Sequence, residues 1–108
     1  MTITSTQSSD KGVVQRTVGS YISSDAAAAF TITLGYQPRY VRIVNETSGD
    51  QLEWFEGMAD LEGFKRLANG TGDMETSTGV TPLSYGFTLA LDAEINVINE
   101  QLSWLAIG

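Results

Sequence analysis

The chain has 108 residues, of which 42% are hydrophobic and 18% charged, a composition that predicts one globular domain rather than a disordered chain. It contains neither histidine nor cysteine, which excludes Ser-His-Asp and Cys-His nucleophiles, Cys/His zinc sites and disulfides. Thirteen acidic against six basic residues give a net charge of −7, so nucleic acid and anionic membranes are unfavourable partners. No apolar run approaches the roughly 20 residues of a membrane span.

Residues 1–10 are predicted to form an N-terminal arm, followed by a single β domain over residues 11–108. The segment MTITSTQSSD is almost wholly Ser, Thr and Gln, and such a segment cannot bury enough apolar surface to order by itself. Two interpretations stay open, a frayed terminus and an extended arm that orders against a neighbouring subunit. In the second, Thr2, Ile3 and Thr4 are candidate contact residues.

Apolar and polar residues then alternate with period two, which predicts strands over residues 13–18, 30–36 and 39–45. Proline at position 38 ends the second of these, because its ring restricts both itself and the preceding residue. The turn cluster Thr47-Ser48-Gly49-Asp50 precedes another strand pattern at residues 51–56. The predicted strands at residues 39–45 and 51–56 are therefore expected to form a hairpin with a loop of four or five residues.

The remaining elements are predicted from residue 57 to the end of the chain. Residues 57–68 are expected to be a loop that leads into a strand at 64–68, because Gly63 disfavours a long helix. Asn69-Gly70 is a hairpin-turn signal, and the polar residues 71–79 are expected to form an exposed loop. Further strands are predicted over residues 86–91, 94–98 and 101–107. The last is apolar on both faces, which indicates a central position in a sheet or an interface.

About seven short strands at this spacing predict an all-β fold, a compact antiparallel β-sandwich or barrel. Trp54 and Phe55 are adjacent on a predicted strand, so their rings point to opposite faces. One ring is expected to fill the core, and the other to lie outside under a loop or at a protein interface.

Six acidic residues fall between Glu46 and Glu62, but their spacing of three to four residues along a hairpin matches no EF-hand signature. Their favoured interpretation is a solvated rim, with a paired-carboxylate site or a cation site as the alternatives. Gly70-Thr71-Gly72 lacks the Lys-Ser/Thr of a phosphate loop, which favours a turn. No catalytic, metal or cofactor site is predicted, and the chain is not expected to be an enzyme.

Two stretches together resemble a known family: GYQPRYVRIVNETSGDQLEWFEGMA at residues 35–59 and GFTLALDAEINVINEQLSWLAIG at residues 86–108. They resemble the small virion proteins of tailed bacteriophages that are encoded near capsid genes. The shared features are a G-x-x-P-R-Y-V-x-V-x-N strand, an x-E-W-x-E-G-M strand and an x-W-x-A-I-G ending. The resemblance covers roughly half of the chain, and similar endings also occur in tail-fibre domains.

The resemblance implies a capsid decoration, or cement, protein on the outer surface of the virion, which bridges capsomers of the major capsid protein as a homotrimer. The candidate contact residues in the β domain are Tyr36, Arg39, Tyr40, Arg42, Trp54, Phe55 and Trp104. The first alternative is a tail-fibre or receptor-recognition module that binds surface glycans through Tyr36, Tyr40 and Trp54. The second is a small hydrolase built on Glu53 and Glu56.

Overall fold

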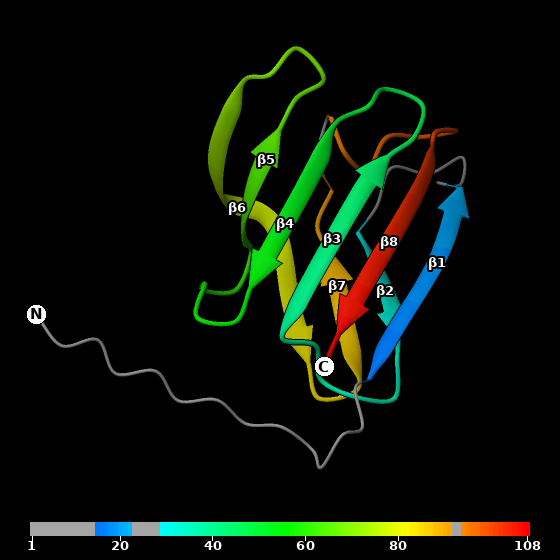
Figure 1. The fold of residues 1–108 in the computed structure, drawn as a ribbon, viewed down its shortest axis with the longest axis vertical. Coiled ribbons are helices and arrows are strands. Elements are labelled where there is room, and N and C mark those ends of the chain that lie inside the picture. The colour runs from blue at the N-terminus through cyan, green and yellow to red at the C-terminus, as the bar shows by residue number, and fades with distance from the viewer. Residues whose placement is uncertain (1–14, 23–28, 92–93) are drawn as a thin grey trace, which may run out of the picture.

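The computed structural model describes residues 15–22, 29–91 and 94–108 (Figure 1), and these ranges contain eight β-strands and no helix. The all-β prediction is therefore confirmed. The strands are β1 (Arg16–Ile22), β2 (Phe30–Thr33), β3 (Tyr40–Asn45), β4 (Gln51–Phe55), β5 (Glu62–Arg66), β6 (Gly72–Leu83), β7 (Gly86–Leu89) and β8 (Gln101–Ile107). The predicted arm over residues 1–10 lies outside the described ranges.

The eight strands form one antiparallel sheet in the order β1-β8-β3-β4-β5-β6-β7-β2. The sheet curls along the long strand β6, whose two halves pair with different strands. Its first residues pair with β5, and residues 80–83 pair with β7. A register shift between Glu62 and Gly63 marks the bend. As Figure 1 shows, β7 and β2 lie behind a front layer of β1, β8, β3, β4 and β5, which gives a half-barrel.

The hydrophobic core lies between the front layer and the strands behind it. Its buried side chains are Val41, Ile43, Leu52, Trp54, Leu102 and Ala106 from the front layer, Val80, Phe87 and Leu89 from the back, and Ile95 from the 94–100 segment. Every second residue of β3, β4 and β8 faces inward, as the sequence alternation predicts. The Trp104 ring meets Phe87 edge to face, with ring centroids 5.9 Å apart.

The two ends of the sheet, β1 and β2, meet through side chains. The rings of Tyr21 and Phe30 stack with their centroids 4.5 Å apart. At the other end of β1, the hydroxyls of Thr17 and Tyr36 lie 2.9 Å apart, and the Tyr36 hydroxyl donates to the Ala106 carbonyl at 3.1 Å. Packing of aromatic side chains therefore covers the open side of the half-barrel where the backbones do not pair.

Several local predictions are confirmed. β3 and β4 form the expected hairpin, and β5 and β6 are joined at Asn69-Gly70, where Gly70 has a φ of +95°. The last strand, β8, lies in the interior of the sheet, between the edge strand β1 and β3. One of its apolar faces packs on the core. The other is part of the outer surface of the sheet, which is itself partly apolar.

Two local predictions are wrong. Residues 71–79, expected as an exposed loop, belong mostly to β6, because their backbone pairs with β5 in spite of their polar side chains. Residues 94–98, expected as a strand, form bends and the start of a turn. The Asn45 side chain donates to the carbonyl of Ile95 at 3.0 Å, so a side-chain contact rather than a strand ladder holds this segment.

Candidate binding face

The outer surface of the front layer is a broad sheet face whose side chains come from alternate strand positions. We call it the basic–apolar face. Strand register aligns its residues in three rows: Arg16, Ile107, Tyr40 and Phe55; then Val18, Leu105, Arg42, Glu53, Phe64 and Met74; then Ser20, Ser103, Val44, Gln51, Arg66 and Gly72. Residues from both ends of the chain are thereby placed side by side.

Exposed apolar side chains concentrate on this face. Within the described ranges seven large hydrophobic residues are exposed. Three of them belong to these rows, Val18 (68%), Phe55 (47%) and Met74 (48%), and Ile22 (63%) follows Ser20 on the same side of β1. They lie at separate points, because register places Val18 and Met74 at opposite ends of one row with Arg42 and Glu53 between them. The face is therefore partly apolar and partly polar along its whole width, a mixture that is common at protein interfaces.

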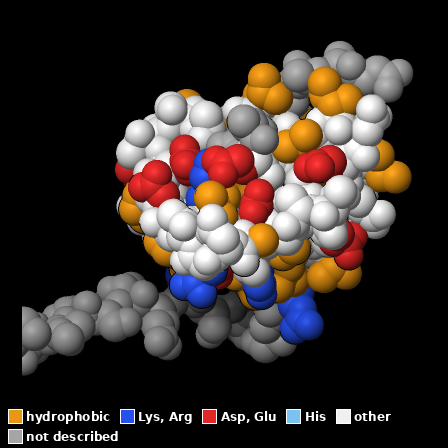
Figure 2. Space-filling view, turned by 90° about the horizontal axis from the view of Figure 1, so that it is seen from above, with side chains coloured by type: hydrophobic (Ala, Val, Ile, Leu, Met, Phe, Trp, Pro, Cys, Tyr) orange, Lys and Arg blue, Asp and Glu red, His pale blue; other side chains and the backbone are white. Residues whose placement is uncertain are grey.

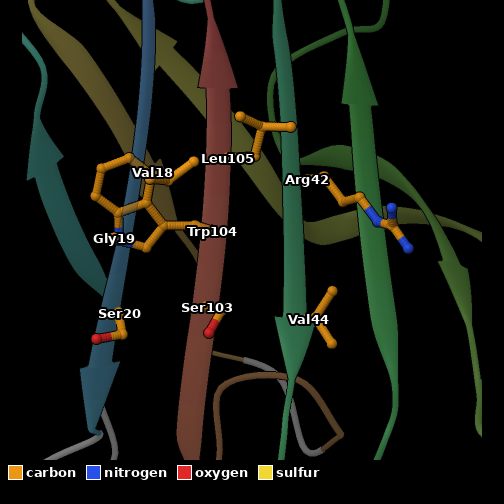
Figure 3. Close-up of a pocket in the computed structure, with 8 residues that line it drawn as sticks. All are labelled: Val18, Gly19, Ser20, Arg42, Val44, Ser103, Trp104 and Leu105. Carbon is orange, nitrogen blue, oxygen red and sulfur yellow. The ribbon is translucent and has the colours of Figure 1, made fainter.

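The face has a hollow over β1 and β8, at the short side chains of Ser20 and Ser103. A shallow hollow of about 500 Å³ is lined by Val18, Ser20, Arg42, Val44, Ser103 and Leu105, with Gly19 and Trp104 beneath (Figure 3). The hollow exists because Ser20 and Ser103 lie opposite each other and are shorter than their neighbours in the adjacent row. It is wide and open, which suits a side chain from another surface better than an enclosed small molecule.

Polar contacts orient several side chains of the basic–apolar face. The Tyr40 hydroxyl donates to Glu53 Oε2 at 2.7 Å, and burial together with this bond to a carboxylate raises the pKa of Tyr40 to about 12. Arg42 donates from Nη2 to Gln51 Oε1 at 2.6 Å. The Tyr40 and Phe55 rings lie 5.1 Å apart, so the aromatic part of the face is also packed in place.

Three of the residues predicted as contacts are brought together here, since Tyr40, Arg42 and Phe55 lie on the basic–apolar face. Arg39 lies beyond the start of β3 and forms an ion pair with Glu56 at 3.1 Å. The structure therefore brings these residues, which are neighbours in the sequence, to two different places.

The other predicted contacts lie elsewhere. Trp54 is only 3% exposed and packs in the core, so its ring offers no face to a glycan or a partner. Trp104 packs against the core from the inner side, and Tyr36 bonds to Thr17 and to the Ala106 carbonyl. Thr2, Ile3 and Thr4 lie outside the described residues.

Sequence reasoning missed several members of the face, including Arg16, Val18, Phe64, Arg66 and Met74. Val18 was already on a predicted strand, but which face was solvated depended on a register that no local pattern reveals. Met74 was missed because its segment was expected to be a loop.

The acidic residues between positions 46 and 62 do not converge on one point. Glu53 accepts from Tyr40, Glu56 pairs with Arg39, and Glu62 Oε1 accepts the Ala59 amide at 2.7 Å. No group of three or more acidic, histidine or cysteine residues that could hold a metal ion is found among the residues described. The same part of the chain contains no helix long and apolar enough to cross a membrane.

One charged cluster is centred on a buried lysine on the inner side. Lys65, 8% exposed, forms ion pairs with Glu75 at 2.9 Å and Glu94 at 2.7 Å. The cluster joins β5, β6 and the 94–100 segment. Because these charges pair with one another, its evident role is to hold these three segments together.

Comparison with protein-family models, with curated proteins and with solved structures found no match to this chain.

Proposed function

We propose that this chain is a structural protein of a tailed-bacteriophage virion, which decorates the outer surface of the capsid and stabilises it by bridging capsomers. The observation that carries the proposal is the basic–apolar face, a broad open surface with exposed apolar side chains and oriented polar groups. The sequence resemblance supports it as well, because the stretches at 35–59 and 86–108 include β3, β4 and β8, which build most of this face.

The shape of this face suits the mechanical task of a decoration protein. Specific protein interfaces bury about 800 Å² on each partner, and a sheet face built from five strands and the start of β6 provides a continuous surface for such a contact. The partner would be the major capsid protein. A homotrimer at local threefold positions would multiply modest contacts through effective concentration.

Co-sedimentation with expanded, undecorated capsids of the source phage tests the proposal. Wild-type protein should bind saturably at a stoichiometry that matches the threefold sites of the lattice. Phe55→Ala should weaken binding, while Tyr85→Ala should not, since Tyr85 is equally exposed (50% against 47%) but lies in the turn between β6 and β7. Absence of saturable binding by the wild type would refute decoration. Equal binding by both variants would refute the assignment to this face.

A glycan-binding tail-fibre module is the second candidate, and one observation favours it. The adjacent rings of Tyr40 and Phe55 could stack on a sugar, since Phe55 is exposed. In that case the protein would ignore capsids and bind a glycan array, and Phe55→Ala would abolish the glycan signal.

A further inference from the structure

Positive charge is distributed unevenly over this acidic chain. Five of its six basic residues are described, and two of them are already paired, Lys65 in the buried cluster and Arg39 with Glu56. The other three, Arg16, Arg42 and Arg66, are all exposed and all lie on the basic–apolar face.

Within the described ranges none of these three arginines forms an ion pair. Arg42 donates to the neutral amide of Gln51, and the Arg66 guanidinium lies 5.9 Å from the centroid of the Phe64 ring. Both contacts orient a guanidinium without neutralising it.

Few carboxylates on this surface are placed to form ion pairs with these arginines. The three rows that define it carry one of the ten described acidic residues, Glu53, and Glu53 already accepts a hydrogen bond from the Tyr40 hydroxyl. The other nine lie outside these rows. Figure 2 shows a similar separation, with most basic side chains along the lower margin and acidic ones gathered, around one basic group, over the end that faces the viewer.

We propose that the partner surface that docks on the basic–apolar face is itself acidic as well as apolar. It would place carboxylates against Arg16, Arg42 and Arg66 and an apolar side chain in the hollow beside Arg42. This inference rests on the proposed decoration function and specifies the chemistry of the capsid site. A chain of net charge −7 is repelled by an acidic surface, whereas the three arginines on this face, none in an ion pair among the residues described, attract it, so the charges select the docking orientation.

A protein surface fits these observations better than nucleic acid or a membrane. Proteins that bind duplex DNA through its backbone commonly contact about 6–10 phosphates, whereas this face has three separate arginines. Exposed apolar side chains, among them Val18 and Met74, lie between and beside them, and such side chains need an apolar counterpart.

Binding to expanded capsids, measured from about 50 to 500 mM NaCl, tests the inference with Arg→Gln variants at the three positions, singly and together. Each single variant should weaken binding about three- to tenfold at low salt, and the triple variant about 100-fold or more. Wild-type binding should weaken with salt, while the residual binding of the triple variant should not. Arg→Lys variants should retain most of the affinity, which separates charge from packing.

Ser84→Asp is the matched control. It lowers the net charge by one, as Arg42→Gln does, but lies in the exposed turn between β6 and β7. Its binding should stay within about twofold of the wild type, because charges outside the contact are screened. Unfolding midpoints close to the wild-type value would confirm that each variant folds.

The outcomes separate the two proposals. Saturable wild-type binding that the triple variant retains at full strength would overturn the acidic-partner inference and leave decoration standing. No wild-type binding at any salt concentration would overturn decoration itself. Arginine-dependent binding to a duplex DNA fragment or to anionic vesicles, or arginine-dependent self-association in sedimentation equilibrium, would overturn the assignment of an acidic capsid surface as the occupant.

Discussion

Replacement of Asn45 by alanine is expected to lower the free energy of unfolding by about 3 kcal/mol, well above the cost of a typical surface substitution. Asn45 is fully buried at the end of β3. Its Nδ2 donates to the Ile95 carbonyl at 3.0 Å and to Glu100 Oε1 at 2.8 Å. Its Oδ1 accepts the amides of Thr47 at 2.9 Å and Ser48 at 3.0 Å. One side chain thus joins the β3–β4 turn to the 94–100 segment.

The expected loss of unfolding free energy depends on which hydrogen-bond partners of Asn45 are left unpaired. A typical hydrogen bond contributes about 1 kcal/mol net, and a buried group left unpaired costs about 1–3 kcal/mol. The two turn amides belong to exposed residues and can bond to water, whereas the contacts to Ile95 and Glu100 are less accessible. The loss of these contacts and the small cavity together give about 3 kcal/mol, or about 10–20 °C in Tm for a domain of this size.

Urea unfolding monitored by near-ultraviolet circular dichroism measures the effect. Asn69→Ala is the control, because Asn69 Oδ1 accepts the Thr71 amide at 2.9 Å in a similar turn that is fully exposed, and its loss should cost less than about 1 kcal/mol. Asn45→Asp keeps the acceptor but replaces the Nδ2 donor with a carboxylate oxygen beside Glu100, so its loss includes charge repulsion as well as the missing contacts to the 94–100 segment. A loss in Asn45→Ala no greater than that in Asn69→Ala would refute the reasoning.

Two further predictions concern the front layer. A Cβ added at Gly19 would lie 2.5 Å from Trp104 Cζ2, so Gly19→Ala should destabilise the fold by about 1–3 kcal/mol, while Ser20→Ala on the outer face should cost less than about 1 kcal/mol in the same urea assay. Equal losses would contradict the proposed packing. Tyr40, with its pKa raised to about 12, should ionise late in an ultraviolet pH titration, and Glu53→Gln should bring its midpoint down. Because the folded pKa exceeds the unfolded value of about 10, the stability that Tyr40 contributes is present below pH 10 and is lost as the pH rises towards 12. An unchanged midpoint in the variant would show that Glu53 is not responsible.

Local chemistry was enough to predict several strands and hairpins. The alternation in β3 and β4 and the turn residues at 47–50 describe one hairpin, and Asn69-Gly70 marks a second. These signals are readable because side-chain period and turn conformation depend on residues close together in the chain.

Elements that depend on distant partners were not predictable in this way. The polar residues 72–79 become part of a strand because β5 pairs with the start of β6. Residues 94–98 resemble a strand in pattern, but the Asn45 side chain, about 50 residues away, binds their backbone instead. The residues of these two segments alone therefore do not predict their structure, because the contacts that decide it come from elsewhere in the chain.

The amino-acid sequence alone establishes an acidic all-β chain without histidine or cysteine chemistry, and it requires that Trp54 and Phe55 point to opposite faces. The tertiary structure decides that Trp54 is the core residue and that Phe55 is exposed. It also decides that Arg16, Arg42 and Arg66 share one surface. The reason is that register between strands far apart in the sequence follows from how the core packs, and a shift of one residue would turn each of these side chains to the other face.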